Sequence, residues 1–168
     1  ISINAFLRSD RDLVDWTYNR EQRFARQANA LDMTVRGLEL LGSWADRRLR
    51  VTLGATLLDK DANYGTTEVD ASFYALNYPE RLLTGGIVWQ VSQRIFIRLD
   101  QAYRYQAPNP LRNSQREAFH TNVSLNWDVA ERIRLALVVD NVTDEAFEYF
   151  PGTPAARRQG SVQLSLEF

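Results

Sequence analysis

Residues 117–142 read EAFHTNVSLNWDVAERIRLALVVDNV, and this stretch decides the fold class. Apolar and polar residues alternate from Phe119 to Leu125, and they alternate again through Leu137 after the short polar segment 128–132. A period of two residues is typical of β-strands, because successive side chains of a strand point to opposite faces. The stretch therefore predicts two antiparallel strands joined by a tight turn.

The same period of two residues continues through the rest of the chain, and no segment has a helical period. It predicts eight strands, at roughly 1–18, 27–45, 48–59, 73–92, 94–105, 117–128, 131–142 and 157–168. The first strand loses its phase near residues 9–11, which indicates a β-bulge. Tight turns at 45–48, 91–94 and 128–132 alternate with long polar connections at 19–27, 59–72, 106–116 and 143–156.

The composition is that of an ordered chain of about one domain, with 168 residues, 45% hydrophobic residues, 24% charged residues and a net charge of −1. The small net charge gives no indication of a nucleic-acid partner. The chain has no Cys, which excludes disulfides and thiolate metal sites. It opens directly on a strand pattern, without Met or a signal peptide, so we expect it to be a piece of a longer protein.

Charged side chains of the last four predicted strands fall on one parity, whereas the apolar parity carries almost none. A lipid-facing surface requires this separation, because Arg or Lys at the midplane of a bilayer costs about 2–4 kcal/mol. We interpret the charged parity as the lumen of a barrel, where the charges either join neighbouring strands by ion pairs or line a pathway for a ligand. The predicted lumen residues are Arg98, Asp100, Arg104, His120, Arg132, Arg134 and Asp140.

Large aromatic residues stand on the apolar parity near the tight-turn ends of four strands, namely Trp44, Trp89, Trp127 and Phe168. Aromatic side chains at one height are typical of a membrane–water boundary. Together with the alternation of short and long connections, they predict an all-β transmembrane barrel of eight antiparallel up-and-down strands. Its tight turns would be periplasmic and its long loops extracellular. A soluble β-sandwich or lipocalin, with the apolar parity turned inward, is the alternative.

The last 40 or so residues resemble the end of a TonB-dependent outer-membrane receptor. The resemblance lies in the element Asn141-Val142-Thr143-Asp144, the aromatic residues after it, a loop with Pro and Gly, and Arg157 before a last strand that ends in Phe168. Upstream, Gly37-Leu38-Glu39 is similar to a strand motif of the family. Residues 74–79 (YALNYP) and 13–16 (LVDW) are similar to further family elements.

The resemblance implies that residues 1–168 are the C-terminal portion of a larger barrel, without the plug domain and the N-terminal strands. The expected function is active transport of a scarce large ligand, either cobalamin or a ferric siderophore, rather than catalysis. The expected partners are outer-membrane lipid, the barrel assembly machinery, TonB through the missing plug, and the extracellular ligand. We expect the protein in the outer membrane of a Gram-negative bacterium, with its C-terminus on the periplasmic side. Val162, Leu164, Leu166 and Phe168 would form the signal that the assembly machinery reads.

Two other interpretations remain open. The chain could be a complete small outer-membrane barrel of eight strands, with a structural or adhesion role. Residues 59–70 (DKDANYGTTEVD) partly match a calcium loop, with Asp59, Asp61, Asn63 and Asp70 as the candidate ligands, although the glycine is one place late and no helices flank it. No other cofactor is expected, and His120, the single His, lacks partners for a catalytic triad.

Overall fold

The computed structural model describes residues 1–22 and 26–167, and these residues form an all-β structure. Its strands are β1 (Ser2–Tyr18), β2 (Gln27–Ala45), β3 (Leu49–Asn63), β4 (Ala71–Ser72), β5 (Pro79–Ser92), β6 (Ile95–Gln106), β7 (Glu117–Ala130), β8 (Ile133–Asp140), β9 (Glu148–Phe150), β10 (Thr153–Pro154) and β11 (Gln159–Leu166). No helix in these two ranges is long and apolar enough to cross a membrane.

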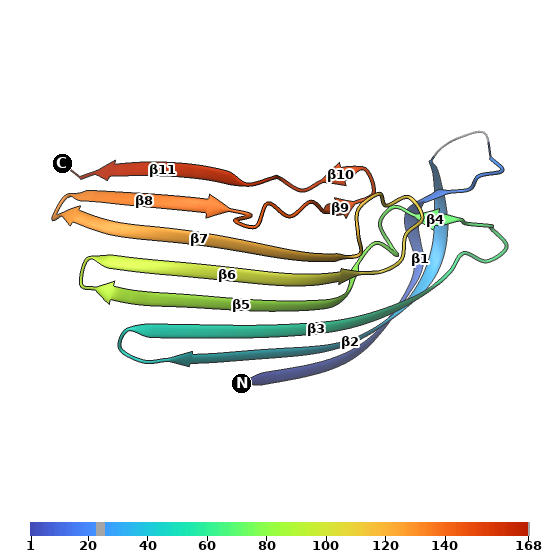
Figure 1. The fold of residues 1–168 in the computed structure, drawn as a ribbon. Helices are drawn as coiled ribbons and strands as arrows, with labels where there is room; N and C mark the ends of the chain where they lie inside the picture. The colour runs from blue at the N-terminus through green and yellow to red at the C-terminus, as the bar shows by residue number, and fades with distance from the viewer. Residues whose placement is uncertain (23–25, 168) are drawn as a thin grey trace.

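One antiparallel sheet contains all eight long strands, in the order β11-β8-β7-β6-β5-β3-β2-β1-β4 (Figure 1). Each long strand pairs with its neighbour in sequence, which is the predicted up-and-down topology. Strands β11 and β1 lie toward opposite edges and do not pair with each other among the described residues. The sheet is therefore open, and both edges leave backbone groups free for further pairing.

The eight predicted strands are confirmed, but several of their bounds were wrong. The fifth strand begins at Pro79 rather than at residue 73, because residues 73–78 form part of a folded loop. The third strand continues to Asn63, so the predicted loop at 59–72 starts later than expected. The short strands β4, β9 and β10 lie inside the long connections and were not predicted.

Tight turns and long loops lie at opposite ends of the sheet, as predicted (Figure 1). The turns join β2 to β3, β5 to β6, and β7 to β8. The long connections join β1 to β2, β3 to β5, β6 to β7, and β8 to β11. We call the latter side the long-loop end.

A β-bulge interrupts β1, close to the predicted position. Asp10 lies opposite Met33, whereas Leu13 lies opposite Leu31, so β1 carries one extra residue there. Asp12 at the bulge has φ = 55°, and its backbone N–H donates to a carboxylate oxygen of Asp32 at 3.1 Å. A bulge of one residue reverses the parity of the strand beyond it.

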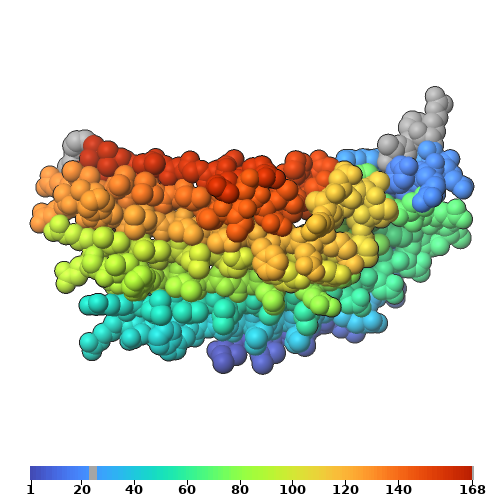
Figure 2. All heavy atoms as spheres, viewed as in Figure 1, coloured from blue at the N-terminus to red at the C-terminus, as the bar shows by residue number. Residues whose placement is uncertain are grey.

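Most of the buried hydrophobic side chains in the described residues form two small clusters at the long-loop end rather than one core. The first cluster is built on Leu31, Met33 and Val35 of β2. The second contains Ala118, Phe147 and Ala155. In Figure 2 the atoms near residue 115 lie against those near residue 150, at the long-loop end of a broad slab of strands. The long loops are thus packed on the sheet.

Candidate functional site

One face of the sheet is apolar and exposed, and we call it the apolar face. The strand pairings place the side chains of Trp44, Trp89 and Trp127 on this face, with exposed fractions of 57%, 47% and 41%. Exposed aliphatic side chains on the same face include Ile3, Leu7, Leu40, Leu53, Leu57, Leu83, Ile87, Leu137, Val162 and Leu164. Three charged residues toward the long-loop end, Arg36, Asp59 and Arg81, share this parity, and Arg36 and Asp59 form an ion pair at 3.4 Å. The rest of the face is apolar and exposed, and an apolar surface of this size marks contact with lipid or with another protein.

The three tryptophans follow a diagonal across the strands. Trp44 lies opposite Val51 of β3, whereas Trp89 lies opposite Leu49, two residues nearer the tight turns. The same offset appears between β5 and β7. On the intervening strand β6, Trp89 lies opposite Ile97 and Trp127 lies opposite Ile95, which is two residues nearer the tight turns. The line therefore moves by one residue per strand toward the tight-turn end.

This slope has a simple geometric meaning. A shift of one residue, about 3.3 Å along a strand, for each strand spacing of about 4.8 Å corresponds to a tilt of roughly 35°. Strands of closed barrels tilt by about 35–45° to the barrel axis. A boundary perpendicular to that axis would thus cross these strands along the line of the three tryptophans.

The bulge in β1 keeps the apolar face apolar at the long-loop end. Before the bulge, Ile3 and Leu7 are exposed on the apolar face, and after it Val14 and Trp16 take that face. The same change of parity turns Asp15 inward, where it is 1% exposed. Without the extra residue, Asp15 would fall on the parity of Ile3 and Leu7.

The opposite, polar face carries the predicted lumen residues of the central strands. Arg98 and Asp100 lie opposite Ser124 and Asn122 of β7, and His120 lies opposite Ala102. Arg98 donates to Asp100 through two hydrogen bonds of 2.6 and 2.9 Å. This pair lies within one strand, so it differs from the interstrand pairs that the sequence suggested.

Other predicted lumen residues have different partners. Arg134 of β8 does form an interstrand pair, since its Nε lies 2.7 Å from Oδ1 of Asp128 on β7. The guanidinium of Arg104 lies over the ring of Tyr149, 5.1 Å from its centroid. Arg132 lies in the tight turn between β7 and β8, and Asp140 ends β8 opposite Gln159.

A hollow of about 280 Å³ lies between β3, β5, β6 and β7. Two glycines of the polar face make room for threonine side chains there. A Cβ on Gly54 would lie 2.5 Å from Oγ1 of Thr84, and a Cβ on Gly86 would lie 2.6 Å from Oγ1 of Thr52. The hollow is also lined by Asp100, His120 and Asn122.

The loop between β3 and β5 folds onto the polar face, with Asp15 as its anchor. The Asp15 carboxylate accepts hydrogen bonds from the hydroxyls of Tyr64 (2.8 Å) and Ser72 (2.6 Å). It also accepts from the backbone N–H groups of Tyr74 (3.3 Å) and Ala75 (3.2 Å). A buried carboxylate requires such donors. Burial and the bond to Asp15 raise the pKa of Tyr64, which keeps its hydroxyl a donor.

The loop between β8 and β11 folds onto the same face. Phe147 packs with Ala118 of β7, and its ring lies 5.7 Å from the ring of His120. The neighbouring ring of Tyr149 lies edge-on to Phe147 at 4.8 Å. His120 is thus placed beneath a loop aromatic.

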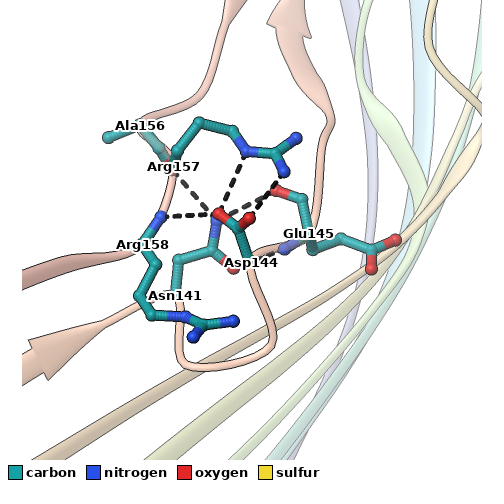
Figure 3. A network of polar contacts seen from close by, with 6 residues as sticks. All are labelled: Asn141, Asp144, Glu145, Ala156, Arg157 and Arg158. Atoms are coloured by element: carbon teal, nitrogen blue, oxygen red, sulfur yellow. Dashed lines mark hydrogen bonds and ion pairs between the residues drawn. The ribbon is translucent and has the colours of Figure 1, made fainter.

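A polar network fixes the two ends of that loop (Figure 3). The amide of Asn141, which is 1% exposed, donates to the carbonyl oxygens of Glu145 (2.9 Å) and Ala156 (3.0 Å). Its side-chain oxygen accepts the backbone N–H of Glu145 at 2.9 Å. Asp144 accepts two hydrogen bonds from Arg157, at 3.0 and 2.7 Å. The motif noted in the sequence therefore joins the end of β8 to the start of β11.

The predicted calcium ligands do not form a loop of the expected kind, because Asp59 and Asp61 lie on strand β3. Asp59 is 3.4 Å from Arg36, and Asp70 is 3.4 Å from Arg20. Among the residues that the structure describes, no group of three or more His, Asp or Glu is placed to hold a metal ion. A groove of about 610 Å³ is nevertheless lined by Asp61, Asn63 and Asp70. Calcium binding there stays a prediction.

The predicted assembly signal is described in part. Val162, Leu164 and Leu166 are exposed on the apolar face of β11, opposite Leu137, Leu135 and Ile133 of β8. Phe168, the last member of both the signal and the aromatic girdle, lies outside the described residues.

Sequence reasoning missed the polar residues that hold the loops, namely Asp15, Lys60, Asn77, Arg112 and Glu148. Lys60 belongs to this set because its Nζ donates to the carbonyl of Ala75 at 3.2 Å. Asp15 could have been recognised from its position, because it falls on the apolar parity of the first strand unless a bulge precedes it. A bulge before it turns its carboxylate to the polar face. Each of the others lies in or beside a polar connection, where sequence alone does not distinguish a buried side chain from a solvated one.

No protein-family model matches the chain, and no curated protein sequence matches it. Solved structures with the same fold include two outer-membrane receptors. The closed form of the ferric-catecholate import receptor Fiu from E. coli K12 is 15% identical, with a TM-score of 0.67 over 99% of this chain. The siderophore receptor PiuA from Acinetobacter baumannii is 14% identical, with a TM-score of 0.70 over 98% of this chain.

The chain spans about a quarter of the length of both receptors, 25% of the first and 26% of the second. At this level of identity the likeness establishes the fold. The described residues therefore have the fold of a portion of the β-barrel of an outer-membrane siderophore receptor.

Proposed function

We propose that this chain is the C-terminal barrel portion of a TonB-dependent outer-membrane transporter, and that it transports a ligand rather than catalysing a reaction. The observation that carries the proposal is the diagonal line of Trp44, Trp89 and Trp127 on an open apolar face. A soluble sheet would bury these side chains in a core, whereas a tilted membrane strand presents them at one boundary.

The charged side chains support the same orientation of the sheet. Arg98, Asp100 and Arg134 all lie on the face opposite the tryptophans, where they form ion pairs. In a barrel wall this face would line a hydrated interior, and the apolar face would contact lipid. The tight turns and the C-terminus would then be periplasmic, and the long-loop end extracellular.

The ligand that we propose is a ferric siderophore. Both solved structures compared above, Fiu and PiuA, are receptors for ligands of this class. The cobalamin alternative draws no support from either of them. The plug domain, TonB and the barrel assembly machinery would be partners of the whole protein.

The alternative is a complete small barrel of eight strands. Closure would require β1 and β11 to pair, yet they lie toward opposite edges of the open sheet. Their free edges favour a larger barrel in which further strands of the same protein cover them.

The test is transport by the full-length protein in a Gram-negative strain that lacks other catecholate receptors. We expect uptake of radiolabelled iron from a ferric tris-catecholate to appear with the protein, and to disappear when TonB is deleted. Uptake of cobalamin but not of the ferric catecholate would refute the siderophore assignment. Recovery of the protein outside the outer membrane would refute the transporter proposal itself.

A further inference from the structure

Three loops meet at the long-loop end, and we call them together the loop cluster: residues 64–78, 107–116 and 141–158. They are far apart in sequence, but each contacts the next. The side-chain amide of Asn109 donates to the carbonyl of Ser72 at 2.7 Å, which joins the first two loops. Asn113 donates its backbone N–H to the carboxylate of Glu148 at 3.3 Å, which joins the last two.

One side chain bridges all three members of the cluster. The Nη1 group of Arg112 donates to the backbone carbonyl of Glu148, and its Nη2 group donates to the side-chain oxygen of Asn77. Asn77 in turn donates its amide to the carbonyl of Tyr149 at 2.9 Å. The middle loop thus holds both outer loops through a single guanidinium.

The environment of Arg112 makes these bonds hard to replace. Burial lowers the pKa of its guanidinium, while the charge of Glu148 opposes that shift. Its Nε is buried and has no hydrogen-bond partner among the described residues. Asn77 and Glu148 are themselves buried. Removing either acceptor would leave one N–H group of a partly buried charge without a partner, which costs more than a neutral bond contributes.

We propose that Arg112 makes the loop cluster a single cooperative unit, so that its three loops open and close together. Displacement of any one loop breaks a bond of the shared guanidinium and weakens its hold on the other two. A ligand or partner that rearranges one loop would therefore change the accessibility of all three. This inference concerns the loops alone and holds whichever ligand the protein transports.

Backbone amides within each loop can report its opening separately. The N–H of Asn77 donates to Tyr74 O at 3.2 Å, and the N–H of Leu111 donates to Asn109 Oδ1 at 3.0 Å. The N–H of Ala155 donates to Phe147 O at 2.8 Å. None of these three bonds involves the Arg112 side chain, so their protection responds to loop opening rather than to a missing contact.

The experiment is hydrogen exchange of the full-length protein in lipid nanodiscs, with Arg112→Ala compared to the unmodified protein. Arg112→Ala removes two hydrogen bonds that join the loops. Amide exchange should therefore become faster by about tenfold or more in all three loops. The matched control is Arg158→Ala. Its guanidinium makes no hydrogen bond or ion pair with the described residues, and only its backbone N–H bonds Asp144. Arg158→Ala should leave the 64–78 and 107–116 loops unchanged. Acceleration confined to 107–116 in Arg112→Ala would overturn the proposal.

A second variant covers the case in which Arg112→Ala fails to assemble. Asn77→Ala removes an acceptor of Arg112 and a donor to Tyr149, but leaves the charge in place. We expect it to accelerate exchange at Leu111 and at Ala155. Because Asn77 also bonds Tyr149 directly, Leu111 is the reporter that depends on the guanidinium. Unchanged exchange at both reporters in Asn77→Ala would show that the loops move independently.

Discussion

The carboxylate of Asp144 accepts both hydrogen bonds of one guanidinium edge of Arg157, across 13 residues of chain, and also accepts the backbone N–H of Arg158 at 2.9 Å (Figure 3). These bonds fix the position at which the chain enters β11. Because they favour the charged carboxylate, they lower the pKa of Asp144 from 3.8 to about 2.

The first prediction follows from the sign of that shift. A carboxyl whose pKa is depressed by folding stabilises the fold above its unfolded pKa, and this contribution is lost as the pH falls through the folded pKa. We expect Asp144→Asn to accelerate hydrogen exchange in residues 141–158 at neutral pH. The difference from the unmodified protein should shrink as the pH falls from about 4 to about 2. Glu145→Gln, whose carboxylate points away from the network, is the control, and an equal effect in both variants would contradict this account.

The second prediction concerns Asn141, whose buried amide makes three hydrogen bonds at a residue with φ = 50°. Asn141→Ala should lower the free energy of unfolding by roughly 2–4 kcal/mol, because buried backbone groups lose their partners and Ala tolerates this φ poorly. Asn141→Gly loses the same bonds without the backbone strain, so it should be less damaging by about 1 kcal/mol. Denaturant unfolding in bilayers measures both. Equal stability of Asn141→Ala and the unmodified protein would refute the assigned role.

The third prediction compares two glycines of β2. The ring of Phe6 lies over Gly37, and a Cβ there would lie 2.2 Å from its Cζ. At Gly42 the nearest atom to a Cβ, the carbonyl oxygen of Leu53, is 4.0 Å away. Gly37→Ala should destabilise the protein by about 1–3 kcal/mol, since the ring must move, and Gly42→Ala should be close to neutral. The two variants differ by one methyl each, and the reverse order of stabilities would show that Phe6 does not pack as described.

The fourth prediction concerns the last residue. If Val162, Leu164, Leu166 and Phe168 form the assembly signal, deletion of Phe168 should reduce the amount of protein in the outer membrane. Ligand affinity of the assembled fraction should change little. Quantitative blotting of membrane fractions and ligand titration separate the two effects. Normal membrane levels without Phe168 would contradict the signal.

The period of two residues was sufficient to predict the strands, because strand periodicity depends only on alternation along the chain. Strand β2 occupies residues 27–45, as predicted, and the bulge near residue 10 was visible as a change of phase. The faces of Trp44, Trp89 and Arg98 also followed directly from parity. The offset between the tryptophans required the register of neighbouring strands, which single-strand patterns do not contain.

The loops were not predicted, because their contacts join residues that are distant in sequence. Asp15 and Ser72 are 57 residues apart, yet a hydrogen bond between them holds the 64–78 loop on β1. Residues 73–78 were included in the fifth predicted strand, but turn bonds and the donors to Asp15 give them a different conformation. Polar composition suggested solvated loops, whereas Asn77, Asn141 and Glu148 are buried hydrogen-bonding residues.

The central claim is that the apolar face contacts lipid and the polar face contacts water, and alternate residues of β7 test it most directly. Residues 1–168 contain no native Cys, so single Cys substitutions at Val123, Ser124, Leu125 and Asn126 can carry a spin label in bilayers, in a full-length protein whose Cys residues outside this range are replaced by Ser. We expect labels at Val123 and Leu125 to be accessible to dissolved oxygen, and labels at Ser124 and Asn126 to be accessible to a water-soluble nickel chelate. Absence of alternation, or alternation with the two quenchers exchanged, would contradict the account.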